Sequence, residues 1–277
     1  MVVSKKIKFF LREHKAKHHF HLGETSANDT FFYLTTHLDT PIAATLDSLK
    51  TLSKGNYEPR VLSHYNRYLQ TAAGYLKKVP FSDLRAFDMI SSSLPQNIHW
   101  QIANSSPVRY IQLFDLPTGT EVFCNRGTAG IDGSTATAMG AAQINPKQTV
   151  LITGDLSFFY DVNGLWNNYI PRDTRIIVIN NQGGGIFRIL PGDKDTSKYD
   201  TYFETIHNRN ARNVAKSFGL GYKRVQTKWG LKQALKTFFK PGGKAKILEI
   251  CTPRKTNNMV LLGYFKAMVT NELNQQL

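Results

Sequence analysis

Between residues 82 and 250, short apolar runs alternate with stretches of helical periodicity, and this alternation constrains the fold more than any other feature of the sequence. The runs are rich in Ile, Val and Leu and are short, as expected of strands that are buried on both faces. Parallel strands joined by crossover helices produce this order of elements. We therefore predict an α/β fold with a parallel sheet and helices on both faces, with strands at 98–103, 122–124, 149–153, 176–180 and 247–250, and helices at 82–94, from 107, and at 133–142, 162–169, 210–218 and 229–239.

The sequence on either side of this region is less regular. Residues 7–11 have helical spacing and residues 18–22 have the pattern of a short strand. We predict a further helix at 29–37, irregular helix and connections at 38–78, and a boundary near Val79-Pro80. Towards the other end of the chain an apolar stripe predicts a packing helix that contains Leu261, Leu262, Phe265, Met268 and Val269.

The composition is that of a globular protein with a core. The chain has 277 residues, of which 41% are hydrophobic and 20% charged, enough for one large domain or two smaller ones. Its longest apolar stretches are far shorter than the ~20 residues that span a bilayer, and the amino-terminal sequence lacks the apolar core of a secretory signal. Cys124 and Cys251 are too isolated for a disulfide framework. We expect a cytoplasmic protein without a membrane span.

The formal net charge of +15 predicts an anionic partner, which can be nucleic acid, phospholipid or a small ligand with phosphates and carboxylates. The basic residues are scattered along the chain, which favours solvated helix faces, and no nucleic-acid motif is recognisable. A basic nucleic-acid-binding module therefore remains only an alternative, which would require affinity that falls steeply with salt. The histidines between His14 and His21 lack a Cys or carboxylate that would complete a metal site.

Polar residues follow two successive predicted strands at the points where the strands end. Asp155 follows Gly154 after the first of them, Leu156-Ser157 open the next turn with free backbone N–H groups, and Asn181 follows the second strand. The carboxyl ends of parallel strands meet at one edge of a sheet, so these side chains are expected to share a crevice. A carboxylate, a carboxamide oxygen and a carbonyl of the following glycine run are ligands suited to Mg²⁺.

Each of these features also has a purely structural explanation. A lone Asp at a strand end is often a helix cap, and Asn-Gln-Gly-Gly can be a turn. The combination of both features at this spacing favours the metal site. The glycine run 183–185 is predicted to let a bulky planar ligand approach the main chain.

Three segments in this order resemble those of thiamine diphosphate enzymes. The stretch "GDL" followed by "NN" is similar to their magnesium–diphosphate motif, with Leu156 in place of the usual glycine. Together with "CNRGTAGIDGSTATAMG" (124–140), "GDLSFFYDVNGL" (154–165) and "NNQGGGIFRILP" (180–191), it resembles the 2-succinyl-5-enolpyruvyl-6-hydroxy-3-cyclohexene-1-carboxylate synthase family of menaquinone biosynthesis. The match covers about residues 105 to 191.

This resemblance implies thiamine diphosphate and Mg²⁺ (or Mn²⁺) as cofactors, and it implies roles for individual residues. The metal would be held by Asp155, Asn181 and the Gly183 carbonyl. Apolar residues would contact the rings of the cofactor, Ile131 as a wedge beneath them and the catalytic pair Ile186 and Phe187 beside the thiazolium. The diphosphate would be lined by Gly154, Leu156 and Ser157.

The implied reaction decarboxylates 2-oxoglutarate and adds the product to isochorismate. Both substrates are dicarboxylates, and arginine is suited to binding carboxylates. The segments "NSSPVRY" and "NRGTAGID" match substrate-binding segments of the family, which implies substrate contacts from Ser105, Arg109 and Arg126. Another thiamine diphosphate lyase with a different acceptor is the alternative among enzymes.

The resemblance also implies a domain organisation. Residues 1–78 would be part of the middle domain of the family and residues 79–277 its diphosphate-binding domain. The pyrimidine-binding domain, which in the family supplies a glutamate that activates the cofactor across a subunit interface, has no counterpart in this sequence. We therefore expect a carboxyl-terminal half that is inactive alone, and a homo-oligomer, dimer or tetramer, for the full-length enzyme.

Overall fold

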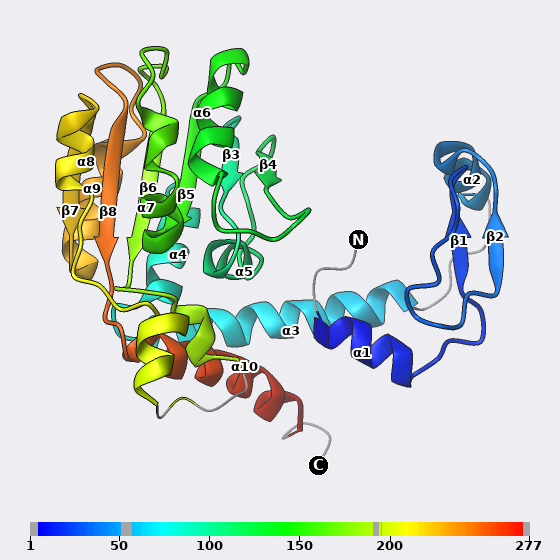
Figure 1. The fold of residues 1–277 in the computed structure, drawn as a ribbon. Helices are drawn as coiled ribbons and strands as arrows, with labels where there is room; N and C mark the ends of the chain where they lie inside the picture. The colour runs from blue at the N-terminus through cyan, green and yellow to red at the C-terminus, as the bar shows by residue number, and fades with distance from the viewer. Residues whose placement is uncertain (1–4, 51–56, 191–193, 195, 274–277) are drawn as a thin grey trace. The chain divides into compact units, whose positions relative to one another are not determined.

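The computed structural model describes residues 5–50, 57–190, 194 and 196–273 (Figure 1). It divides the chain into two compact units, Met1–Tyr65 and Asn66–Leu277. The division falls inside helix α3 (Tyr57–Lys78), ahead of the boundary predicted near Val79-Pro80. The assignment of residues 1–78 to part of a middle domain remains a prediction.

The second unit is built on a six-stranded sheet in which every neighbouring pair of strands is parallel (Figure 1). The spatial order of the strands is β4-β3-β5-β6-β8-β7. This confirms the predicted parallel sheet. The strands are β3 (His99–Ile102), β4 (Glu121–Cys124), β5 (Thr149–Gly154), β6 (Arg175–Asn180), β7 (Gly221–Val225) and β8 (Lys246–Cys251).

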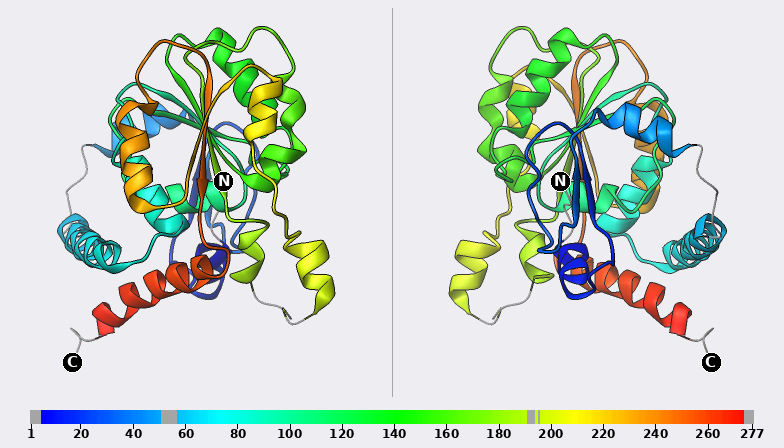
Figure 2. Two further views of the ribbon diagram at one scale, coloured as in Figure 1. Left: turned by 90° about the vertical axis from the view of Figure 1, so that its left-hand side faces the viewer. Right: turned by 90° about the vertical axis from the view of Figure 1, so that its right-hand side faces the viewer.

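Helices cover both faces of this sheet (Figure 2). Successive residues of a strand point to opposite faces, and accordingly Ile177 and Ile179 of β6 belong to one apolar core while Ile176 and Val178 belong to another. The first core includes residues of α4 (Asp83–Ser91), α5 (Ser106–Ile111), α9 (Lys228–Phe238) and α10 (Thr256–Leu273). The second includes residues of α6 (Ser134–Ile144), α7 (Asp155–Tyr160), the 3₁₀ helix η1 (Val162–Leu165) and α8 (Arg212–Ser217).

The strand order places a crevice at a defined position in the sheet. The chain passes from β3 outwards to β4 and then returns to the other side of β3 to form β5, from which it continues to β6. Connections that leave neighbouring strands in opposite directions open a crevice at the carboxyl ends of those strands, which is where ligands of such sheets bind. The loops after β3 and β5 flank this position.

Strand β7 and the segment 162–169 of this unit differ from the prediction. Strand β7 was not predicted, because as an edge strand it carries exposed Lys223 and Arg224 in its middle and lacks an apolar run. The helix predicted at 162–169 is wrong, since that segment contains only the short η1 and the regular helix α7 precedes it. Helix α7 begins directly at the end of β5, so the strand leads without a linker into the predicted site.

Helix α3, which was predicted as irregular, is regular over its whole length, and its second half packs on α10. The Tyr68 and Tyr264 hydroxyls lie 2.7 Å apart, and the Tyr75 hydroxyl donates a hydrogen bond of 2.8 Å to the Val260 carbonyl. Helix α10 is the predicted packing helix, but the apolar residues that it buries, among those whose burial the structure describes, are Val260, Leu261 and Tyr264, whereas Leu262, Phe265 and Val269 are exposed.

The first unit contains α1 (Lys5–Glu13), α2 (Ile42–Leu49) and a parallel pair of short strands, β1 (Phe20–Leu22) and β2 (Thr36–Leu38). The helix predicted at 29–37 is wrong. The Asp29 carboxylate accepts a hydrogen bond from the Tyr33 N–H, and Phe32 has a φ of 65° that a helix does not allow. In the described parts of both units, no helix is long and apolar enough to cross a membrane.

Candidate functional site

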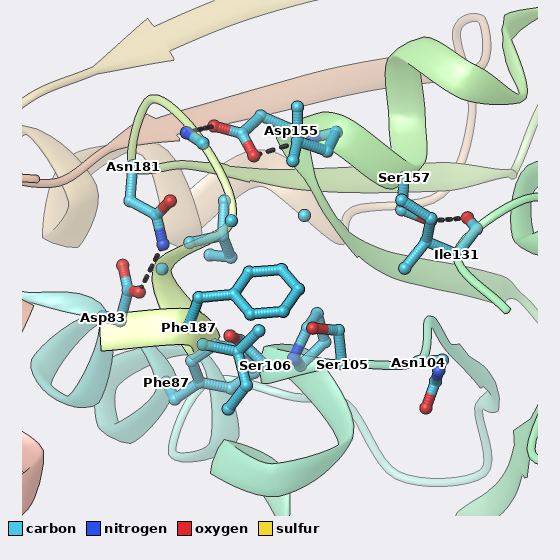
Figure 3. Close-up of a pocket in the computed structure, with 18 residues that line it drawn as sticks. Asp83, Phe87, Asn104, Ser105, Ser106, Ile131, Asp155, Ser157, Asn181 and Phe187 are labelled. Carbon is cyan, nitrogen blue, oxygen red and sulfur yellow. Dashed lines mark hydrogen bonds between the residues drawn. The ribbon is translucent and has the colours of Figure 1, made fainter. Parts of the chain in front are cut away.

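A pocket lies at the carboxyl ends of β3, β5 and β6, in the crevice set by the strand order (Figure 3). The residues that line it come from the segments immediately after these strands, from the loop after β4 and from α4. The lining includes every site residue predicted from the sequence except Arg109 and Arg126. The predicted residues that line the pocket are Ser105, Ile131, Gly154, Asp155, Leu156, Ser157, Asn181, Gly183, Ile186 and Phe187. The fold thus brings together residues that are far apart in the chain.

Asp155 is the buried carboxylate of the pocket, with only 2% of its surface exposed. Its Oδ1 accepts a hydrogen bond from the Leu156 N–H at 2.7 Å, and its Oδ2 accepts one from the Gly183 N–H at 3.0 Å. The second bond ties the end of β5 to the end of β6, as the predicted metal site requires. The Leu156 N–H is therefore not one of the free groups that the sequence predicts.

His207 also faces Asp155 and was not identified from the sequence. Its Nδ1 accepts a hydrogen bond from the Arg209 N–H at 3.1 Å, so the neutral ring carries its proton on Nε2. This Nε2 lies 3.2 Å from the Asp155 Oδ2, out of line for a good hydrogen bond. The imidazole lies next to the Asp155 carboxylate. Groups that neighbour a metal ligand in this way can orient it. No sequence signal marks His207, because its segment has no periodicity.

The two carboxamides at the end of β6 have different tasks. Asn180 holds the turn: its Nδ2 donates to the Glu249 Oε1 at 2.7 Å and to the Arg209 carbonyl at 3.0 Å, and its Oδ1 accepts from the Gln182 N–H at 3.1 Å. Asn181 turns towards the pocket, and its Nδ2 donates to the Asp83 Oδ2 at 2.8 Å. The buried Asn181 Oδ1 has no hydrogen-bond partner among the described residues.

An unpartnered buried oxygen is costly unless a ligand satisfies it, so the Asn181 Oδ1 indicates a bound group. The Gly183 carbonyl accepts one hydrogen bond, from the Gly185 N–H at 2.9 Å, and retains a second lone pair. A carboxylate, a carboxamide oxygen and a carbonyl oxygen suit a hard cation such as Mg²⁺. Within the described segments no three His, Cys, Asp or Glu side chains form a metal cluster, so phosphate or water oxygens would have to complete this ligand set.

The structure explains the glycine run differently from the prediction, which assigned it to the approach of a ligand. A Cβ on Gly183 would lie 2.5 Å from the Glu204 carbonyl oxygen, and one on Gly184 would lie 3.0 Å from the Phe203 carbonyl oxygen. The Gly184 N–H also donates to the Glu204 carbonyl at 2.6 Å. Close packing against the chain's own segment 203–205, rather than the approach of a ligand, therefore requires these two glycines.

Gly154 shows the opposite situation. No atom lies within 4 Å of the position that a Cβ would take there, and the residue lines the pocket. Its φ of −81° is accessible to any residue. The backbone after β5 is therefore open to the pocket at the position where the sequence predicts a diphosphate, and a side chain would enter that space.

Glu204 anchors the segment that packs on the glycines. Its carboxylate is 2% exposed, forms an ion pair with Arg188 and lies 3.1 Å from the Arg254 Nη1. The Arg188 Nη1 in turn donates to the Arg254 carbonyl at 2.9 Å. Buried ion pairs of this kind fix geometry more than they add stability, so the network holds the glycine run in place.

The apolar and hydroxyl residues of the prediction are also in the pocket. The Ser157 hydroxyl donates to the Ile131 carbonyl and so ties the loop after β4 to α7. The Phe187 ring points into the middle of the pocket (Figure 3), and it packs edge-on against Phe203 at 5.8 Å between ring centroids. Ile186 and Phe187 belong to the 3₁₀ helix η2 (Gly185–Arg188), which follows directly from the glycine run.

The predicted substrate residues lie at the side of the pocket formed by the loop after β3. Ser105 lines the pocket with a φ of 76°, a strained conformation for a residue that is not glycine. The Arg109 Nη1 donates to the Ser105 carbonyl at 2.7 Å. Burial, and secondly the nearby charge of Arg126, lower the pKa of the Arg109 guanidinium. Arg126 itself donates to Asn104, which lines the pocket.

Asp83, in the first turn of α4, is a second buried carboxylate of the pocket and was not predicted. Burial raises the pKa of its carboxyl to about 6, although hydrogen bonds from Thr252 and Asn181 oppose this shift, and the charge of Asp155 raises the pKa further. An Asp at a helix start is ordinary, so the sequence contains no signal for this residue. Packing of α4 against the loops after β6 and β8 places it in the site.

The raised pKa of Asp83 predicts a particular dependence of stability on pH. The folded protein binds this proton more tightly than the unfolded chain, so Asp83 makes folding less favourable as pH rises from about 4 to about 6. A shift of this size corresponds to about 3 kcal/mol. The free energy of unfolding of Asp83→Asn relative to the wild type should therefore rise by most of that amount between pH 4 and pH 7.5. Urea denaturation of both proteins at the two pH values measures this, and a difference independent of pH would contradict it.

Comparisons with known proteins match the part of the chain that contains most of the pocket residues. The family described as "Thiamine pyrophosphate enzyme, C-terminal TPP binding domain" matches residues 105–249. The chain is 48% identical over 269 residues to a 2-succinyl-5-enolpyruvyl-6-hydroxy-3-cyclohexene-1-carboxylate synthase of Flavobacterium psychrophilum, with 96% of this chain and 49% of that protein covered. For the synthases of Christiangramia forsetii and Porphyromonas gingivalis the identities are 43% and 37%, with 97% and 95% of this chain and 47% and 48% of those proteins covered. The chain thus spans about half the length of these relatives.

Proposed function

The chain belongs to the thiamine pyrophosphate enzymes, and we propose that its pocket binds this cofactor, thiamine diphosphate, through a divalent cation. The observation that carries the proposal is the unpartnered Asn181 Oδ1 beside the buried carboxylate of Asp155. Both belong to residues that follow neighbouring strands, and the Gly183 N–H bond to Asp155 holds the two strand ends together. The proposed metal is Mg²⁺ or Mn²⁺, held by Asp155, Asn181 and the Gly183 carbonyl.

The remaining pocket residues suit the two ends of the cofactor. The open backbone at Gly154, with Leu156 and Ser157, would border the diphosphate. Ile131, which Ser157 holds in place, would support the rings from below, and Ile186 and Phe187 would exclude water beside them. When bound, the cofactor would supply a carbon nucleophile for decarboxylation and carbon–carbon bond formation.

We propose a dicarboxylate substrate on the side of the pocket formed by the loop after β3. Burial, and secondly the nearby charge of Arg126, lower the pKa of the Arg109 guanidinium, and an anion bound between the two guanidinium groups would offset their repulsion. Ser105 would contribute a hydroxyl at the pocket wall. We propose 2-oxoglutarate as donor and isochorismate as acceptor, as the resemblance to the family implies, and a different acceptor is the alternative.

The relatives are about twice as long as this chain, and we propose that the group that activates the cofactor is supplied by sequence outside it. A homo-oligomeric assembly, dimer or tetramer, of the longer protein would bring this group to the pocket. On this proposal the residues described above bind the cofactor and metal, and turnover requires the additional part.

Thermal denaturation of the wild-type chain with thiamine diphosphate, with and without Mg²⁺, tests the proposal. A ligand that binds only the folded state at a hundred times its dissociation constant stabilises it by about 2.7 kcal/mol, which corresponds to a rise in melting temperature of about 5–10 °C for a chain of this size. We expect this rise only when Mg²⁺ and the diphosphate are both present. Thiamine without its diphosphate is the matched control, and an equal rise with thiamine, or without Mg²⁺, would refute the metal–diphosphate site.

A further inference from the structure

A closed ring of hydrogen bonds lies behind the Asn181 carboxamide. The Asp83 backbone N–H donates to the Asn257 Oδ1 at 2.8 Å, the Asn257 Nδ2 donates to the Thr252 Oγ1 at 3.2 Å, and the Thr252 hydroxyl donates to the Asp83 Oδ1 at 2.5 Å. All three residues are buried. The ring joins the start of α4 to the segment after β8 and ends at the carboxylate that faces the pocket.

The direction of every bond in this ring is fixed by one group that can only donate. Because the Asp83 N–H is a backbone donor, Asn257 must turn its oxygen to it and its amino group to Thr252. The Thr252 Oγ1 then accepts a hydrogen bond from the Asn257 amino group, and its hydroxyl donates one to the Asp83 Oδ1. One carboxylate oxygen of Asp83 is thereby occupied as an acceptor, and the other, Oδ2, faces Asn181.

We propose that Asp83 is a positioning residue that sets which end of the Asn181 carboxamide faces the cofactor pocket. An ionised carboxylate only accepts hydrogen bonds, so Asn181 must direct its amino group to Asp83 and leave its oxygen to the pocket. That oxygen is a cation ligand, whereas an amino group at the same place would repel a cation. This inference rests on the proposed metal and cofactor site and adds a residue outside the ligand set.

The ring predicts what Asp83→Asn would do. The Thr252 hydroxyl still requires an acceptor, so the new carboxamide must turn its oxygen to Thr252 and its amino group to Asn181. Asn181 can then satisfy that donor only with its own oxygen, which turns its amino group into the pocket. Asp83→Asn replaces one carboxylate oxygen by an NH₂ group of similar size and removes a buried charge. It would thus flip the Asn181 carboxamide, so that an amino group faces the pocket in place of the proposed metal-binding oxygen.

The test is a titration of Mg²⁺ at pH 8 and saturating thiamine diphosphate, with melting temperature as the readout, on the wild type, Asp83→Asn and Thr252→Val. Outer residues that orient metal ligands typically contribute about 10-fold to 100-fold in metal affinity. We expect the Mg²⁺ concentration at half effect to rise by about that factor in Asp83→Asn, while the metal-free protein still melts cooperatively. Thr252→Val should lower the metal-free melting temperature, because the Asn257 amino group loses its acceptor. The Mg²⁺ concentration at half effect should stay within about threefold of the wild-type value, since the Asp83 carboxylate still accepts a hydrogen bond from Asn181.

The outcomes separate this inference from the proposed function. If the wild type responds to Mg²⁺ and Asp83→Asn responds at the same concentration, the positioning role is refuted while the cofactor site stands. If Thr252→Val shifts the midpoint as much as Asp83→Asn, loss of local packing explains both and the positioning role is again refuted. If the wild type shows no response to Mg²⁺ with the cofactor, the proposed site fails and this inference fails with it.

Discussion

Asp155→Ala should abolish the Mg²⁺-dependent stabilisation by thiamine diphosphate. Asp155 carries the only formal charge among the three proposed metal ligands, and it is buried where water screens it little. Removing it leaves Asn181 and Gly183 with neutral oxygens, which bind Mg²⁺ weakly without a carboxylate. We expect the metal affinity to fall by more than about a hundredfold, more than for the loss of an outer residue. Thermal denaturation with cofactor over a range of Mg²⁺ concentrations measures this loss.

The same substitution also removes hydrogen-bond acceptors, so the absolute melting temperature is not the readout. The Leu156 and Gly183 N–H groups lose their acceptor in Asp155→Ala, and the metal-free variant should melt a few degrees below the wild type. The difference between melting temperatures with and without Mg²⁺ isolates the metal effect. Asp132→Asn is the matched control, because its exposed carboxylate lies next to Ile131 without lining the pocket. A metal-dependent rise that survives in Asp155→Ala would exclude this carboxylate as a ligand.

The sheet could be predicted from the sequence because its central strands are buried on both faces. A strand such as β5 or β6 must then be apolar over most of its length, and the resulting runs stand out from the helices between them. The edge strand β7 could not be found in this way, since Lys223 and Arg224 are exposed and break the run. The wrong helix at 29–37 has a local cause, the positive φ of Phe32, which only the folded loop imposes.

The site was predictable to the extent that it lies at strand ends. Parallel strands align their carboxyl ends, so Asp155 and Asn181 were expected to line one crevice once the two strands were assigned, and both line the pocket. Asp83 reaches the same pocket from a helix start, and His207 reaches Asp155 from an irregular segment, and only tertiary packing brings them there. The residues proposed to bind the metal and the cofactor were thus visible in the pattern, whereas Asp83 and His207 were not.

The glycine run illustrates a different limit of sequence reasoning. Three consecutive glycines indicate that some atoms approach the backbone closely, but the sequence does not reveal from which side. At Gly183 and Gly184 the atoms belong to the chain itself, in the segment that Glu204 anchors. At Gly154 the chain leaves the space open. Adding one methyl group at each position should therefore have opposite consequences.

Gly183→Ala should destabilise the protein severely. Its φ of +145° is unfavourable for any residue with a Cβ, and that Cβ would lie 2.5 Å from the Glu204 carbonyl oxygen, a backbone atom that cannot turn away. A strained backbone conformation alone costs about 1–3 kcal/mol. Relief of the clash would also break the Gly183 N–H bond to Asp155 and the Gly184 N–H bond to Glu204. We expect a total loss of more than about 3 kcal/mol in the free energy of unfolding, measured by urea denaturation.

Gly154→Ala is the matched control, because it adds the same methyl group at another glycine that lines the same pocket. With a φ of −81° and no atom within 4 Å, alanine fits there without strain and should leave stability unchanged or raise it by up to about 1 kcal/mol. Its methyl group would occupy the space proposed for the diphosphate, so the rise in melting temperature with thiamine diphosphate and Mg²⁺ should shrink. Equal stability of the two variants would show that segment 203–205 does not hold the glycine run, and an undiminished cofactor response in Gly154→Ala would place the diphosphate elsewhere.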